Sequence, residues 1–272
     1  MTEPGTVVRD FPKRLLAASA VTGRVPYGMV FRLGSTRRNQ AGSPTEVPQS
    51  ADPAHPGEPE SPVLSEIDRL FVQAFALVGE GIAGATHALL AGDREAAKEL
   101  VQRDELVDRL THDIAALAQQ RLLSNDGTTE ERRELIAFLR MLTDLERNGD
   151  LAEHIARRAA RGLGAEMSAR SRGLVDRMGE VATQLWRSTA DVFAERSVDG
   201  ANAVDDLDDE MDDLHVTLTA EIVAGDMPVP VAIELAMVAR FYERFGDHAV
   251  SLARRMAAMV GGGPDPGTVA SD

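Results

Sequence analysis

The sequence predicts an all-α protein built as two tandem three-helix bundles, with six long antiparallel helices related by internal pseudo-symmetry. Three observations support this prediction. Aromatic residues make up only 4% of the 272 residues, which favours helices packed through aliphatic side chains over sheets. From Ser61 onward, apolar residues recur at helical spacing. A stretch around Glu146 also recurs around Glu243, which indicates a duplication.

Residues 1–60 show no sustained hydrophobic period and hold most of the 13 prolines. We expect this segment to be a disordered leader, and residues 261–272 to be a disordered tail. The leader contains one apolar run, Tyr27 to Phe31, which is a candidate docking segment. A second interpretation is that translation begins downstream and that the leader is absent from the protein.

Glycine, proline and capping residues set the expected helix limits. Ser61 can act as an N-cap, Pro62 suits the first helical position, and Gly162 is a typical C-terminal stop. The first bundle is expected over residues 61–163 and the second over 164–260. The expected helices run from 61 to the turn at 92–93, from there to about 123, and over 130–161, 165–196, 201–224 and 229–260. Short connections between them make neighbouring helices antiparallel.

Composition excludes several classes of function. The chain has no cysteine, so disulfides, thiolate metal sites and cysteine nucleophiles are excluded, and any metal must be held by oxygen or imidazole. A formal net charge of −15 argues against a nucleic-acid partner, which would need clustered basic residues. We also expect no apolar run long enough to insert in a membrane. These features fit a cytoplasmic protein.

Four pairs of carboxylates are the strongest chemical signal. Each pair is spaced four residues apart, which places both side chains on one face of a helix. Each pair also flanks the apolar stripe of its helix on the same side, so neighbouring helices would turn four carboxylates toward one groove in each bundle. The pairs are Asp104 with Asp108, Glu146 with Asp150, Asp208 with Asp212, and Glu243 with Asp247.

Such oxygen-rich grooves suit Fe³⁺, Mn²⁺ or Mg²⁺, and Zn²⁺ is also compatible. His112 and His154 follow two of the pairs at the same spacing, although neither recurs in the second half. The alternative is an ordinary solvated helix face with surface ion pairs. Seven acidic residues within 205–213, with no basic residue among them, could equally form a docking surface for a basic partner.

Other motifs carry less weight. Residues 79–84 read G-x-G-x-x-G, but they lie in a helical apolar pattern without a preceding strand, so small residues for close helix packing explain them better than nucleotide binding. No Glu-x-x-His motif of the di-iron type and no G-x-S-x-G elbow occurs. The residues therefore predict a protein that is not an enzyme. A metal store or a metal-dependent enzyme using the carboxylate grooves is the alternative.

The duplicated stretches resemble the L/Y-E-R-x-G-D-H-A signature of the PhoU family, in an actinobacterial form. They read Leu145-Glu146-Arg147-Asn148-Gly149-Asp150 and Tyr242-Glu243-Arg244-Phe245-Gly246-Asp247-His248-Ala249. Two positions depart from the signature. Asn148 stands where an apolar residue is usual and Leu151 where histidine is common, so the first groove is expected to be altered or weakly occupied.

The resemblance implies multinuclear iron or zinc clusters held by the eight paired carboxylates. It also implies a negative regulator of phosphate uptake and of the phosphate-starvation response. The expected partners are the ATPase subunit of the phosphate ABC transporter and a sensor histidine kinase, with this protein as the adaptor between them. We further expect a homodimer.

Overall fold

Residues 61–124 and 126–261 are described by the computed structural model of the chain. The expected leader (1–60) lies outside the described residues, as does the expected tail except for Gly261, which ends the last helix. The described part contains seven helices and no strand: α2 (Pro62–Ala91), α3 (Arg94–Leu122), α4 (Thr129–Arg161), α5 (Leu163–Glu166), α6 (Ala169–Glu195), α7 (Gly200–Ala224) and α8 (Val229–Gly261).

The all-α prediction is confirmed, and the six long helices begin and end within a few residues of the expected limits. The single-turn helix α5 was not expected. The N-cap expected of Ser61 is also only partly correct, because Ser61 occupies that position but its side chain makes no capping hydrogen bond. Pro62 does occupy the first turn, where its missing N–H costs nothing.

Three later helices begin with standard capping chemistry, whereas Asp199 before α7 makes no side-chain capping hydrogen bond. The side chains of Asp93, Thr128 and Ser168 each accept a hydrogen bond from a backbone N–H in the first turn of the next helix. Gly92 and Gly162 adopt left-handed φ angles of 69° and 91°, which let the chain leave α2 and α4 sharply. These local signals explain why the sequence alone located the helix ends.

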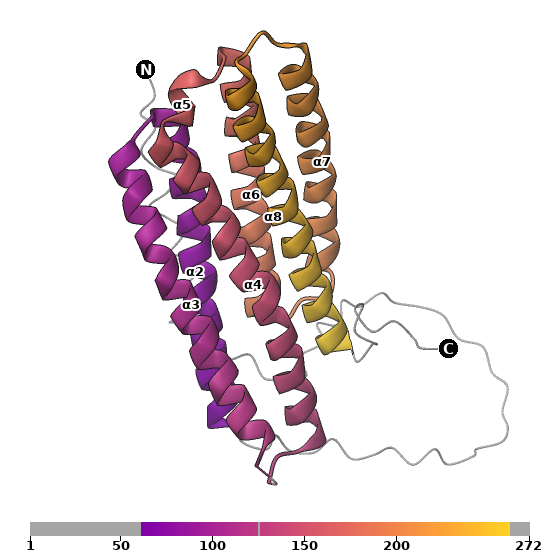
Figure 1. Cartoon of the computed structure of the whole chain (residues 1–272). Helices are drawn as coiled ribbons and strands as arrows, with labels where there is room; N and C mark the ends of the chain where they lie inside the picture. Colours follow the sequence, from indigo (N-terminus) through magenta and orange to yellow (C-terminus); the bar gives the residue numbers. More distant parts are fainter. Residues whose placement is uncertain (1–60, 125, 262–272) are drawn as a thin grey trace, which may run out of the picture.

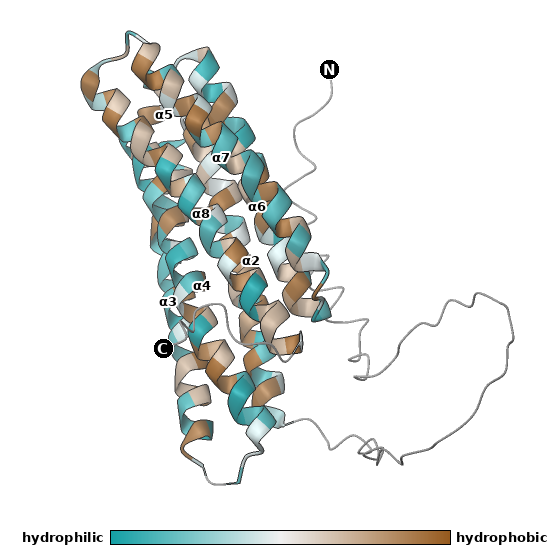
Figure 2. Cartoon of the chain, turned by 90° about the vertical axis from the view of Figure 1, so that its right-hand side faces the viewer, coloured by the Kyte–Doolittle hydropathy of each residue, from teal (hydrophilic) through white to brown (hydrophobic). Residues whose placement is uncertain are grey.

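The helices form two antiparallel trios that pack side by side along their length (Figure 1). One trio is α2, α3 and α4, and the other is α6, α7 and α8. Helix α4 packs against α8 and α2 packs against α6, so the two trios share one continuous hydrophobic core. Hydrophilic and hydrophobic residues alternate along each helix, as amphipathic helices require (Figure 2). The division into two domains stays a prediction.

Trp186 lies where the two trios meet. It is fully buried on α6, and its Nε1–H donates a hydrogen bond of 2.8 Å to the carbonyl oxygen of Phe75 on α2. Its ring packs against Phe75 and against Phe245 of α8, with centroid distances of 5.0 and 5.3 Å. One side chain therefore ties three helices from both trios together.

Arg196 joins the end of α6 to α2 and α4 through ion pairs. It ends α6 with φ 51°, the only positive φ at a non-glycine position among the described residues. Its guanidinium contacts Asp68 of α2 at 2.6 Å and Glu134 of α4 at 3.5 Å. The start of α7 thus lies at the same end of the bundle as the start of α2.

Helix α2 is an exception to the expectation that no apolar run is long enough to insert in a membrane. By length and composition alone it is apolar enough to cross a bilayer, the one such helix in the part of the chain described here. Half of its most apolar window is buried within the fold, and it packs against α3, α4 and α6. Two glycines of its G-x-G-x-x-G run face neighbouring helices: a Cβ at Gly81 would lie 3.6 Å from Ala152 of α4, and one at Gly84 would lie 3.1 Å from Leu100 of α3. Helix α2 is therefore buried and packed in the way expected of a core helix.

Candidate functional site

The first acidic groove lies between α3 and α4. The charges of Asp108 on α3 and of Asp150 on α4 raise the pKa of Asp104, and the charge of Asp108 also raises the pKa of Asp150. Burial is the main cause of the shift at Asp104, whose pKa is raised to about 7, and the charges of Glu153, Asp108 and Asp150 add to it. Burial also raises the pKa of Asp150, followed by the charge of Asp108.

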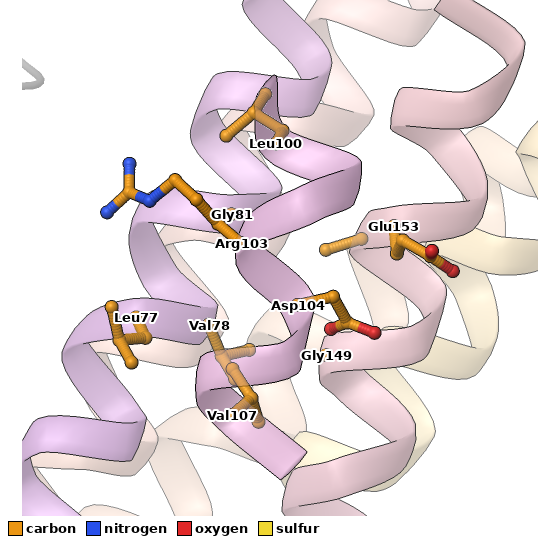
Figure 3. Close-up of a pocket in the computed structure, with 10 residues that line it drawn as sticks. Leu77, Val78, Gly81, Leu100, Arg103, Asp104, Val107, Gly149 and Glu153 are labelled. Atoms are coloured by element: carbon orange, nitrogen blue, oxygen red, sulfur yellow. The ribbon is translucent and has the colours of Figure 1, made fainter. Parts of the chain in front are cut away.

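A shallow pocket opens beside Asp104, lined by residues of α2, α3 and α4 (Figure 3). The carboxylate of Asp104 lies next to Gly149, and Glu153 lies one turn further along α4. Arg103 points away from Asp104 and pairs with Glu80 of α2 at 2.8 Å. Arg157 of α4 is the arginine nearest these carboxylates, since its charge lowers the pKa of both Asp104 and Asp150.

The second acidic groove lies between α7 and α8 and gathers all four expected residues. Burial raises the pKa of Asp208 to about 7, and the charges of Asp212, Asp247 and Glu243 raise it further. Burial likewise raises the pKa of Glu243, followed by the charge of Asp247. The four carboxylates that the sequence assigned to this groove thus share one electrostatic environment.

Glycine in the duplicated motif allows the two helices of each groove to approach. A Cβ added at Gly149 would lie 3.2 Å from Oδ1 of Asp104, and one at Gly246 would clash with Oδ1 of Asp208. Gly149 and Gly246 occupy matched motif positions. Each glycine therefore makes room for an aspartate from the neighbouring helix, a role that the sequence pattern alone did not assign.

Each groove has a further carboxylate that sequence reasoning missed. Glu153 acts on Asp104 in the first groove, and Asp205 acts on Asp208 in the second. These two are not matched in the duplication, since one comes from α4 and the other from α7. Each pairs with an arginine at a matched position, Glu153 with Arg157 at 2.6 Å and Asp205 with Arg254 at 3.2 Å. The matched arginines, Arg157 and Arg254, are the sequence feature that could have indicated these two carboxylates.

Glu146 is the one expected residue that stands apart. It is exposed, and it makes no hydrogen bond, ion pair or electrostatic contact within the described residues. Among residues 61–124 and 126–261, no three His, Asp or Glu side chains are arranged to hold one metal ion. The carboxylates share each groove, but their side chains do not converge on a single point.

The second groove nevertheless has the chemistry of a cation site. Oε2 of Glu243 and Oδ1 of Asp205 are buried and have no hydrogen-bond partner. Buried carboxylate oxygens without partners are costly, and a hard cation would satisfy them. The donor types present therefore suit an oxygen-bound metal, and the unpartnered oxygens favour the second groove, although no three described side chains converge on one point in either groove.

Asn148 and His248 do not line a groove but join the two trios. Oδ1 of Asn148 lies 3.0 Å from Nδ1 of His248, and Nδ2 of Asn148 donates a hydrogen bond of 3.2 Å to the carbonyl oxygen of Phe245. Burial lowers the pKa of His248, which favours its neutral form. The departure from the signature at Asn148 is thus accounted for by a contact between α4 and α8.

Asp208→Asn is expected to stabilise the metal-free protein at high pH. The folded pKa of about 7 exceeds the ordinary value of 3.8, so the charged form is disfavoured by folding and stability falls as pH rises from 4 to 7. The whole shift corresponds to about 4 kcal/mol. Because Asp208 is only half-buried, we expect about 1–2 kcal/mol in urea unfolding at pH 8.

The gain should vanish at about pH 3, below the ordinary value of 3.8, where Asp208 is largely protonated in both states. Asp209→Asn is the matched control, because Asp209 is the neighbouring residue on the same helix and is exposed. It should change the free energy of unfolding by less than about 0.5 kcal/mol at either pH. An equal effect of Asp208→Asn at both pH values would contradict the prediction.

Comparison with known proteins gives a consistent result. A family model described as the PhoU domain matches residues 71–159 and again residues 175–256. The "Phosphate-specific transport system accessory protein PhoU homolog 1" of Mycobacterium tuberculosis is 32% identical over 202 residues, which cover 73% of this chain and 91% of that protein. The second homologue of the same bacterium is 30% identical and covers 71% and 92%.

Solved structures agree in fold. The crystal structure of PhoU from Pseudomonas aeruginosa superposes with a TM-score of 0.69 at 26% identity, covering 74% of this chain and 98% of that one. The phosphate transport system regulatory protein PhoU from Streptococcus pneumoniae superposes with a TM-score of 0.65 at 20% identity, covering 73% and 95%. Both likenesses place the described helices in the same all-helical fold.

Proposed function

This chain belongs to the PhoU family, and on that premise we propose that it is a cytoplasmic accessory regulator of phosphate transport. The relatives that share its two motif copies are named as accessory proteins of the phosphate-specific transport system. The observation that carries the proposal is the match of the family model to both trios, which together span most of the described residues.

In finer detail, the protein is a negative regulator that joins the ATPase subunit of a phosphate transporter to a sensor histidine kinase. Long helices with charged outer faces offer extended surfaces for two partners, as an adaptor requires. The titratable groups gathered in the grooves are mainly carboxylates, which suit the binding of a cation or of basic groups. We therefore place its action in binding.

Affinity purification at high and low phosphate tests this adaptor role. The full chain is used as bait for the transporter ATPase subunit and for the kinase, and we expect more of both partners at high phosphate, because that is when signalling is shut off. Absence of binding to either protein under both conditions would remove the adaptor proposal while leaving family membership intact.

We also propose that the carboxylate grooves bind metal, with iron or zinc as the first candidates and Mn²⁺ or Mg²⁺ as alternatives. Asp208, Asp212, Glu243 and Asp247 would hold the ion in the second groove, and Asp104, Asp108, Glu146 and Asp150 are the corresponding set in the first. A bound cation would neutralise the carboxylates that now repel one another. Metal-stabilised folding or metal storage is the second candidate function that this observation favours.

Removing one carboxylate pair from each groove tests the metal proposal. Glu243→Ala with Asp247→Ala should lower the affinity of the second groove for the added metal by about 100-fold in calorimetry, because two of its four main ligands are lost. Glu146→Ala with Asp150→Ala should have a smaller effect, since Glu146 makes no contact with the other carboxylates. Both pairs flank the core, so far-UV helicity should stay nearly unchanged.

Asp206→Asn with Asp209→Asn is the matched control, because it neutralises two carboxylates of α7 that are exposed outside the groove. Equal losses of affinity in this control and in the groove variants would mean that the metal responds only to the overall negative charge of the protein. A metal-free protein with full regulatory activity would leave the adaptor role and discard the metal-dependent alternatives.

A further inference from the structure

The outward face of α7 is acidic in its first half and apolar in its second half. Asp206, Asp209 and Asp213 follow one another at helical spacing and are all exposed. The same stripe continues with Val216 and Val223, whose exposed fractions are 67% and 81%. We call these five residues the α7 stripe. Figure 2 shows the side of the molecule on which α7 lies.

The apolar half of the stripe continues at the start of α8. Only four residues separate α7 from α8, and the two helices pack against each other. Val229, Ile233 and Met237 of α8 are 70%, 59% and 40% exposed and recur every four residues. Five of the nine large hydrophobic residues exposed in the described chain therefore lie on this one hairpin, although an exposed apolar patch is costly unless something covers it.

The acidic half of the stripe also lacks partners. Asp206, Asp209 and Asp213 make no ion pair with any described residue. The matched positions on α3, found by setting Leu110 against Leu214, hold Gln102, Glu105 and Arg109. There the one acidic residue pairs with the one basic residue, since Arg109 lies 3.9 Å from Glu105. The outer face of α7 is therefore strongly acidic, whereas the matched face of α3 carries one acidic and one basic residue.

A segment of the same chain has the complementary composition. Residues 11–45 contain no acidic residue in a chain of net charge −15, and their six basic residues are Lys13, Arg14, Arg24, Arg32, Arg37 and Arg38. The same segment contains the apolar run from Tyr27 to Phe31, followed by Leu33. Basic groups complement the charge of the acidic half of the α7 stripe, and apolar groups can cover its apolar half.

The order of these groups along the chain also matches the order on the stripe. Helix α2 begins at the end of the bundle where Arg196 joins Asp68, and α7 begins beside Arg196, so the acidic half of the stripe lies toward that end. Counting back from Ser61, Arg38 and Arg37 come before Tyr27. Basic groups would thus meet carboxylates first, and the apolar run would then meet the valines.

The chain is long enough for this contact. Residues 39–60 separate Arg38 from the start of α2, and 22 extended residues span up to about 70 Å. Because α2 packs on α6 and α6 packs on α7, the axis of α7 lies about 20 Å from that of α2, two ordinary interhelical distances. The stripe itself covers about 25 Å of helix.

We propose that residues 11–45 dock on the α7 stripe and on the exposed apolar start of α8 of the same molecule. Arg32, Arg37 and Arg38 contact the three aspartates, and the run from Tyr27 covers the valines. Docking hides the most acidic and the most apolar outer surface of the described chain, so it regulates access of any partner to that surface. This role does not depend on the identity of the transporter or kinase.

Cysteine cross-linking of the full chain tests the contact, because the chain has no cysteine of its own. Gly28→Cys lies in the apolar run that begins at Tyr27, and Ala220→Cys lies exposed on the stripe between Val216 and Val223. A short maleimide cross-linker should join the two within one molecule. The control is Gly28→Cys with Ala116→Cys, since Ala116 is also exposed and is the matched position on α3.

The initial cross-linking rate at Ala220→Cys should exceed that of the control by about tenfold, because docking raises the local concentration of the segment. Ala116 lies nearer the end where α2 begins, so reach alone would favour the control. Adding Asp206→Asn, Asp209→Asn and Asp213→Asn, or about 0.5 M salt, should lower the rate to the control value.

Three outcomes would overturn the proposal. Equal rates at the two positions would mean that the segment has no preference for α7. A rate unchanged by neutralising the aspartates would mean that charge does not direct the contact. A cross-linked dimer whose yield rises with protein concentration would assign the face to the segment of a second copy instead.

Discussion

Trp186→Ala is expected to lower the free energy of unfolding by about 3–5 kcal/mol, the largest effect of any single change considered for this protein. Trp186 is fully buried and contacts Phe75 and Phe245, so truncation leaves a cavity between α6, α2 and α8. It also leaves the carbonyl oxygen of Phe75 without the hydrogen bond from the indole. Denaturant unfolding followed by circular dichroism gives the value.

The same experiment tests whether the two trios unfold together. The core is continuous across the α2–α6 and α4–α8 contacts, so we expect one cooperative transition before and after the substitution. Gln102→Ala is the control, because Gln102 is exposed on α3, and it should change stability by less than about 0.5 kcal/mol. Two separate transitions, with only the later trio destabilised, would show that the trios are independent.

Asn148→Ala is expected to cost about 2–4 kcal/mol of unfolding free energy. The side chain is fully buried and serves two buried groups, Nδ1 of His248 and the carbonyl oxygen of Phe245. His248 would lose its partner and the carbonyl oxygen of Phe245 would lose its second hydrogen bond, and an unsatisfied buried polar group costs about 1–3 kcal/mol. The space that the side chain filled would add to the cost. Thermal and urea unfolding at pH 8 measure the effect.

The pseudo-symmetry supplies a compensating variant. At the matched motif positions, Phe245 replaces Asn148 and Leu151 replaces His248, so the related contact between α4 and α8 has an apolar pair. Asn148→Phe with His248→Leu copies that pair and removes both polar groups at once, which should restore most of the lost stability. Arg147→Ala, an exposed neighbour, should be close to neutral. A cost below about 0.5 kcal/mol for Asn148→Ala would contradict the assignment.

The groove residues show how far pattern reasoning reaches. The spacing of Asp208, Asp212, Glu243 and Asp247 placed all four in one groove, because helical periodicity fixes which residues share a face. The same reasoning placed Glu146 with its counterparts, yet Glu146 makes no contact with them. Periodicity gives the face of a helix but not the direction in which an exposed side chain finally points.

Asn148 and Leu151 illustrate a second limit. As departures from the family signature they suggested a weakened first groove, whereas Asn148 contacts His248 on the other trio. One side of a helix can face a groove while the adjoining side faces a partner helix, and a one-dimensional motif lists both sets of residues together. Only the packing of α4 on α8 separated them.

The sequence by itself determined the all-α class, the limits of the six long helices, the duplication and the acidic composition of the two grooves. These features depend on local signals, namely apolar period, capping residues, glycine and repeated motifs. Tertiary structure alone decided that the trios share one core, that Glu153 and Asp205 join the grooves, and that Gly149 and Gly246 admit a neighbouring aspartate. Those contacts join residues far apart in the chain, and they depend on how helices pack rather than on what any one helix contains.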